Sequence, residues 1–284
     1  MSFLGNSRLF SQSAQNLKIL KWFRISFCIA IFFEVLRISS FFSSLQKDRI
    51  CYPIEIFRWL SIPEVSSNAY QFLIYVLLAS LTAAAFGVFQ RSALFVALVL
   101  FVYVFGIAIG CDRGKENFYT SWQHCIVVFT LLVLLVTPKN ESRGWPIEIL
   151  KFNILVSYFA GGIVKIKTGF DWMNGYTLQY YFIKRHLIFD SPLAFELAQS
   201  LTLMKFFSIS TVIMELLIPI AWFTRRQIGW MFMVLTLVLQ ILCWYLLDLK
   251  WFAFYGWTYL IYLFEIIFYF SERNKINNRV DLFS

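Results

Sequence analysis

The sequence predicts an all-α, polytopic helical membrane protein with about eight transmembrane helices. Hydrophobic residues make up 60% of the 284 residues, whereas only 14% are charged. A soluble domain of this length cannot bury so much apolar surface, because its surface area grows too steeply with its mass. The apolar residues also gather in runs of roughly twenty, which is the length of one bilayer crossing. Lipid is therefore the expected solvent.

The apolar runs follow one another along nearly the whole chain. Helices are expected near Trp22–Phe42, Tyr70–Phe89, Ala93–Gly110, Ser121–Thr137, Trp145–Lys165, Met204–Phe223, Ile228–Leu247 and Trp251–Phe270. Several of the links between these runs are so short that they predict antiparallel hairpins. The connection Ser43–Asn68 and the one that follows Lys165 are longer, so each has room for structure of its own.

The polar residues lie mainly at the two ends of the chain. Residues 1–16 form a polar N-terminal segment, residues 17–271 are expected to form one transmembrane domain, and residues 272–284 form a polar tail. The first apolar run is longer than the core of a signal peptide, and no small-residue cleavage motif follows it. We therefore expect the first helix to be retained.

The basic residues indicate the orientation of the helices. Although the net charge is +9, Lys and Arg are spread over short loops, which argues against nucleic acid as a partner. Alternation places both termini on the same side as Arg91 and Arg225–Arg226, and the positive-inside rule makes that side cytoplasmic. We expect the cell membrane rather than an endomembrane. Cys51 and Cys111 would then face outward, where a disulfide is permitted but their pairing stays open.

The stretch from Tyr158 to Tyr180 differs most from a plain apolar helix. The small residues 160–162 (Ala-Gly-Gly) would allow another backbone to approach closely, and Lys165 follows at the end of the apolar run. Trp172, Asn174 and Gly175 then indicate a compact turn. Two interpretations of Lys165 remain open: its ammonium reaches water along its long stem, or burial keeps the amine uncharged so that it can act as a base.

Other ionisable residues also fall within the expected spans, where charge is costly. Glu34 and Arg37 are three residues apart, so they can neutralise each other on one helical face. Glu215 precedes Pro219 by one turn and can satisfy the amides that a kink frees. Glu265 lies near a helix end, where we expect it to reach water.

His124 is expected at the start of the fourth helix, whereas Lys165 ends the fifth. Because these helices run antiparallel, both residues would lie near the outer membrane boundary and could share one cavity. The alternative for His124 is an ordinary hydrogen-bonded residue at a helix start. No metal site is expected, because the only other histidine, His186, has no ligand at a typical spacing. Phosphate-binding, dinucleotide-binding and nucleophile-elbow motifs are not found in the sequence.

The segment Tyr158–Lys165, followed by Trp172–Tyr176, resembles the signature of the vitamin K-dependent gamma-carboxylase-like domain. This domain is also called the horizontally transferred transmembrane (HTTM) domain. Weaker similar elements occur along nearly the whole chain, at Trp22–Phe27, Phe86–Ser92, Asn117–Pro138, Glu215–Pro219 and Trp251–Phe252.

The resemblance implies roles for individual residues. In the carboxylases, the matching lysine deprotonates vitamin K hydroquinone, which makes Lys165 the expected base, and an Asn-His pair at the entry of the fourth helix corresponds to Gln123 and His124. Lys165 and His124 are thus the catalytic candidates, with Gln123, Trp172, Asn174 and Tyr158 as candidates for substrate binding.

The sequence departs from the carboxylase pattern at several points. Gln123 replaces an asparagine, Gln240 stands where many members have a histidine, and the spacing from Lys165 to Trp172 is longer. The chain also ends after the last helix, so it resembles a short form without the lumenal portion that helps carboxylases engage protein substrates.

Three functions remain open at this point. The first is a lysine-base membrane enzyme acting near the outer leaflet on a quinone-like or other amphipathic substrate. Its cofactor is left open, with a quinone-like molecule as one candidate. The second is a membrane partner in the maturation or export of a secreted peptide, similar to the sporulation-delaying-protein B family. The third is a non-catalytic scaffold in which Lys165 only reaches water.

Overall fold

The computed structural model describes residues 13–47, 59, 61, 66–111, 117–138, 144–168, 172–224, 226–247 and 259–280. Within these ranges every long regular element is an α-helix, as the apolar runs predict. The chain divides into two compact units. The first comprises residues 1–150 and 253–284, the second residues 151–252, and each is described by itself.

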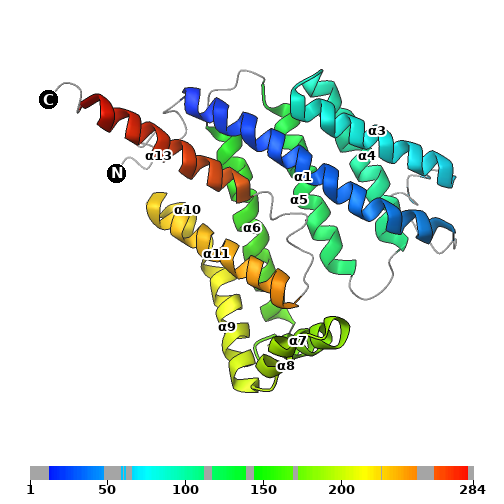
Figure 1. The fold of residues 1–284 in the computed structure, drawn as a ribbon, viewed down its shortest axis with the longest axis vertical. Helices are drawn as coiled ribbons and strands as arrows, with labels where there is room; N and C mark the ends of the chain where they lie inside the picture. Colours follow the sequence, from blue (N-terminus) through cyan, green and yellow to red (C-terminus); the bar gives the residue numbers. More distant parts are fainter. Residues whose placement is uncertain are drawn as a thin grey trace. The chain divides into compact units, whose positions relative to one another are not determined.

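The first unit contains the N-terminal helices and the last one. Its helices are α1 (Ser13–Lys47), α3 (Ser67–Phe86), α4 (Gln90–Cys111), α5 (Asn117–Val136), the first turn of α6 and α13 (Leu260–Val280). Helix α1 packs against α3 and α13, while α4 lies between α3 and α5 (Figure 1). The packing is almost wholly apolar, with Phe23, Phe27 and Leu77 fully buried.

Local signals in the sequence fix the ends of α3. The Ser66 hydroxyl accepts a hydrogen bond from the Ala69 N–H at 3.4 Å, which caps the first turn. Gly87 ends the helix in the left-handed conformation, at φ 76°, where a residue with a Cβ is disfavoured. The chain can therefore reverse within three residues and begin α4.

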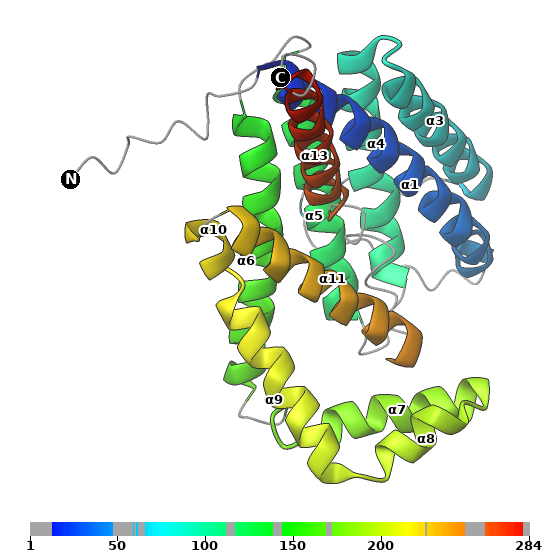
Figure 2. The same cartoon turned by 60° about the vertical axis from the view of Figure 1, so that its left-hand side comes forward.

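The second unit contains most of α6 (Trp145–Lys167), the short helices α7 (Tyr176–Phe189) and α8 (Pro192–Ala198), and then α9, α10 and α11. Helix α9 spans Leu201–Leu217, α10 Ile220–Phe223 and α11 Arg226–Leu247. Figure 2 shows α7 and α8 as a hairpin at the foot of α9, and α11 returns to contact α7. A small core of Leu178, Phe182, Ala194, Ala198 and Met204 holds the hairpin against the start of α9.

The long connection after Lys165 contains the main addition to the predicted elements. The sequence allowed it structure of its own, and the structure fills it with α7 and α8. The single helix expected over Met204–Phe223 is instead divided, because the chain turns at Ile218–Pro219 between α9 and α10. Pro219 cannot donate a backbone hydrogen bond, so an interruption at this position has a direct cause.

Two described helices are long and apolar enough to cross a membrane: residues 68–86 of α3, and α6. A third crossing is obtained if α8 and α9, which meet at a 93° bend, are counted as one broken span. The apolar parts of α4, α5, α11 and α13 are shorter within the described residues. The described residues therefore contain two or three candidate membrane spans, whereas the expected number of about eight is not confirmed.

Candidate functional site

Lys165 lies on the buried face of α6. Lys151, Leu155, Tyr158, Gly162 and Lys165 are all buried, and they recur at three- and four-residue intervals that mark one side of a helix. Only 6% of the Lys165 surface is exposed, whereas Lys167 is an exposed residue. The structure thus does not support an ammonium that reaches water from position 165.

The two glycines of α6 allow α9 to approach closely. A Cβ added to Gly162 would lie 3.1 Å from Leu216 Cδ2 and 3.2 Å from Glu215 Cβ, which is tighter than ordinary packing. A Cβ added to Gly161 would lie 3.6 Å from Glu215 Oε2. The close approach expected at residues 160–162 is therefore confirmed, and its partner is the segment around Glu215.

Lys165 and Glu215 form a buried ion pair across this contact. The Lys165 ammonium Nζ donates a hydrogen bond to Glu215 Oε1, and each side chain is only 8% exposed. The second carboxylate oxygen, Oε2, is buried and has no hydrogen-bond partner among the described residues. Glu215 was expected to serve the kink at Pro219, but the structure pairs its carboxylate with Lys165. A charge pair shielded from water is held by mutual attraction that offsets a large desolvation cost.

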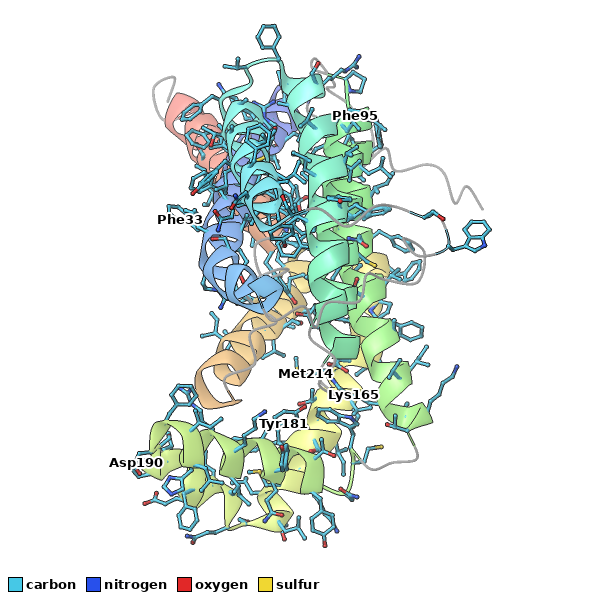
Figure 3. The ribbon with its side chains drawn as sticks, turned by 90° about the vertical axis from the view of Figure 1, so that its right-hand side faces the viewer. Phe33, Phe95, Lys165, Tyr181, Asp190 and Met214 are labelled. Atoms are coloured by element: carbon cyan, nitrogen blue, oxygen red, sulfur yellow. The ribbon has the colours of Figure 1, made fainter. Side chains whose placement is uncertain are left out.

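An aromatic stack lies beside the amine. The Lys165 Nζ atom is 5.1 Å from the ring centroid of Trp172, within the range of a cation–π interaction. The Trp172 ring stacks in turn on Tyr181 of α7, with centroids 6.2 Å apart and planes 26° apart. Figure 3 shows Lys165, Tyr181 and Met214 in one region of the second unit, while Asp190 lies at the far end of α7. The lysine is therefore bordered by one carboxylate and two aromatic rings.

The turn that presents Trp172 has a clear local cause. The backbone N–H of Tyr176 donates to the Asn174 side-chain oxygen at 2.9 Å, so this side chain stabilises the turn at the start of α7. Gly175 has φ 85°, and a Cβ there would lie 2.7 Å from the backbone nitrogen of Lys205. The expected compact turn of Trp172, Asn174 and Gly175 is confirmed, and Gly175 is required by both its conformation and its contact with α9.

The remaining candidate residues are Tyr158, Gln123 and His124. Tyr158 is buried on the same face of α6 as Lys165, two helical turns and therefore roughly 10 Å before it. Gln123 and His124 belong to α5 in the other unit, and their side chains lie outside the described residues. The expected meeting of His124 with Lys165 stays a prediction.

Cys51 also lies outside the described residues, as does the side chain of Cys111 at the end of α4, so their pairing stays a prediction as well.

Two further expectations concern ionisable groups in the first unit. The Arg37 Nε atom donates to both oxygens of Glu34, at 3.1 and 3.0 Å, which confirms their mutual neutralisation. Glu265 is only 7% exposed, so the expectation that it reaches water was wrong. It lies on the buried side of α13 with Ile261 and Tyr262.

Comparison with known protein families identifies one match. Residues 133–227 match the HTTM domain, which confirms the predicted resemblance over this part of the chain. The matched range contains α6 through α10, and hence Lys165, Trp172 and Glu215, whereas Gln123 and His124 precede it. No curated protein and no solved structure matches the chain. The HTTM match and the apolar helices together indicate a membrane protein.

Proposed function

We propose that this HTTM-domain protein uses Lys165 as a general base toward an amphipathic, quinone-like substrate within the membrane. The single observation that carries the proposal is the buried pair of Lys165 and Glu215 next to the Trp172 ring. A buried lysine with one specific charge partner is typical of functional sites in membrane proteins, where unneeded charge is costly.

The Glu215 carboxylate can accept the proton that Lys165 must lose before it acts as a base. An ammonium cannot accept a proton, so Lys165 must first lose one, and Glu215 Oε1 already accepts the hydrogen bond along which that proton can move. The transfer converts an ammonium and a carboxylate into an amine and a carboxylic acid. Low polarity favours this neutral form, because it removes two charges from an apolar environment.

The amine can then take a proton from a hydroxyl group of the substrate. The substrate O–H bond breaks, an N–H bond forms on Nζ, and the resulting ammonium stabilises the substrate oxyanion. The step needs no further reactant. Because Glu215 holds the first proton during this step, it is a participant in the proton transfer and not only a partner in packing.

The rings beside Lys165 suit a flat aromatic substrate. Trp172 is partly exposed and stacks on Tyr181, so the site offers a ring surface against which another ring can pack. Tyr158 and Asn174 remain candidates for substrate contact, and Gln123 and His124 for support of the reacting group. We place this site near the outer leaflet of the cell membrane, with both termini cytoplasmic.

A quantitative lipid extraction tests the substrate class. The protein is purified in nanodiscs cut directly from the membrane, and its quinone-to-phospholipid ratio is compared with that of a bulk membrane extract. We expect a severalfold enrichment of quinone with the wild-type protein. A ratio equal to that of the bulk membrane would contradict a quinone-like ligand.

The Lys165–Glu215 ion pair also fits the alternative of a non-catalytic scaffold, because a charge pair between α6 and α9 links two helices. The double exchange Lys165→Glu with Glu215→Lys distinguishes the two roles. A purely structural pair would recover both stability and function in the exchanged form, whereas a base anchored on α6 would recover stability alone. A peptide partner would instead be indicated by a secreted peptide that copurifies with the protein.

A further inference from the structure

One face of α7 is apolar, aromatic and exposed along its whole length. Tyr176, Tyr180, Ile183 and Leu187 are 59%, 60%, 39% and 77% exposed, respectively. Their spacing of four, three and four residues places all of them on one side of the helix. We call this set the tyrosine face. It carries no charged residue, and it lies opposite Leu178 and Phe182, which are buried against α8 and α9.

The orientation of the hairpin indicates what covers this face. Helix α8 meets α9 at 93°, so only one of these two helices can run along the bilayer normal, and α9 is the longer of them. If α9 crosses the bilayer, α8 runs along the bilayer plane, and α7 runs with it because the two helices pack as a hairpin (Figure 2). The hairpin also joins the end of α6 to the start of α9, and α6 is itself long enough to cross a membrane.

We infer that the α7–α8 hairpin lies in the interfacial layer of the bilayer and that the tyrosine face contacts lipid at the boundary between headgroups and acyl chains. This inference concerns a different surface from the Lys165 site and does not depend on the proposed base. It goes beyond membrane insertion, because it assigns a specific face of a helix that does not cross the bilayer.

The chemistry of the hairpin fits that boundary. Tyrosine side chains concentrate at membrane interfaces because the ring is apolar and the hydroxyl is polar. The same helix carries Lys184 next to Ile183 of the tyrosine face, and such a cation suits lipid phosphates. Glu196 of α8 and Gln199, which follows the end of that helix, are also exposed and offer polar groups to water.

A second copy of the chain is a less suitable occupant of the tyrosine face. A stable protein–protein interface buries about 800 Å² on each partner, supplied by roughly twenty or more residues. The tyrosine face offers a single stripe on one short helix, which is about 21 Å long for the 14 residues of α7. Lipid needs no such area, because it surrounds the stripe without a docking partner.

Site-specific photo-crosslinking in native membranes tests the inference. Tyr180 is replaced by the photoreactive amino acid p-benzoylphenylalanine, and the same amino acid at Glu196, exposed on α8, serves as the matched control. After irradiation, intact-protein mass spectrometry counts phospholipid adducts. We expect a lipid adduct at position 180 and at least a fivefold lower yield at position 196.

A second probe keeps the test decisive if the first substitution impairs folding. The same replacement at Leu187, two turns further along the tyrosine face, should give the same lipid adduct. Equal adduct yields at positions 187 and 196, or a crosslinked protein dimer in place of lipid adducts at positions 180 and 187, would overturn the inference. Because the readout is mass and not activity, the result is independent of Lys165 chemistry.

Discussion

Lys165 of α6 and Glu215 of α9 are joined by a hydrogen-bonded ion pair in which each side chain is only 8% exposed. The pair is made possible by Gly161 and Gly162, which leave no side chain between the two segments. Two oppositely charged groups in an apolar setting depend on each other, since either one alone would be a buried, uncompensated charge. This mutual dependence gives the site several measurable properties.

Removal of one partner should be more damaging than removal of both. Glu215→Leu leaves the Lys165 ammonium buried without its counter-charge, and we expect a loss of about 3–5 kcal/mol in stability. The double variant Lys165→Met with Glu215→Leu should recover most of that loss, because two apolar side chains replace the pair. Thermal unfolding of wild type, Lys165→Met, Glu215→Leu and the double variant in nanodiscs measures the coupling between the two side chains. A double variant as unstable as the sum of both single variants would contradict it.

Gly162 should tolerate a methyl group less well than Gly161. A Cβ at position 162 comes within 3.2 Å of both Glu215 and Leu216, whereas the nearest atom to a Cβ at 161 is at 3.6 Å. We expect Gly162→Ala to cost about 1–3 kcal/mol through overpacking and Gly161→Ala to cost less. Unfolding temperatures of the two variants provide the comparison, and an equal effect would argue against the close approach at position 162.

Gly175→Ala should disturb the turn that holds Trp172. The new side chain would have to adopt φ 85° and would lie 2.7 Å from the Lys205 backbone nitrogen. We expect a destabilisation of about 1–3 kcal/mol from this strain. Asn174→Ala, which removes only the hydrogen bond to the Tyr176 N–H, is the milder control at about 1 kcal/mol. Thermal unfolding measures both losses, and we expect the larger loss for Gly175→Ala. A larger loss for Asn174→Ala would contradict this expectation.

Trp172 should contribute to ligand binding through its ring. Trp172→Phe keeps an aromatic face near the Lys165 Nζ atom, whereas Trp172→Leu removes it. A loss of about 1 kcal/mol corresponds to roughly fivefold weaker binding of reduced menadione by the leucine variant. Equilibrium binding in nanodiscs measures both variants. Wild-type affinity in Trp172→Leu would show that the ring does not contact the ligand.

Much of the local structure follows from sequence signals that act over a few residues. The small residues at 160–162 predict a close helix contact, and the spacing of Glu34 and Arg37 predicts their pairing. Asn174 and Gly175 predict the turn before α7. The Glu34–Arg37 pair and the turn depend on neighbours within about one helical turn, where chain connectivity already fixes the geometry. The glycines predict that a close contact forms, but not that its partner is the segment around Glu215.

The site itself could be predicted only in part. Lys165 is evident as a charge within an apolar run, but its partner Glu215 lies fifty positions away on another helix. Pro219 offered a nearer explanation for that glutamate, and only tertiary packing favours the lysine instead. The connection after Lys165 was expected to have room for structure, but α7 and α8 were not predicted individually, because both helices are short and their apolar residues face both the core and the outside.

The central claim is that Lys165 removes a proton from a bound hydroquinone, and one absorbance measurement tests it most directly. Reduced menadione is added under anaerobic conditions to wild type, Lys165→Ala and Lys167→Ala in nanodiscs, and the absorbance of the hydroquinone anion is recorded. Lys167 is the matched control because it is an exposed lysine on the same helix. We expect the anion with wild type and Lys167→Ala, and a loss of at least tenfold with Lys165→Ala. Equal anion formation in the two alanine variants would contradict a lysine base at position 165.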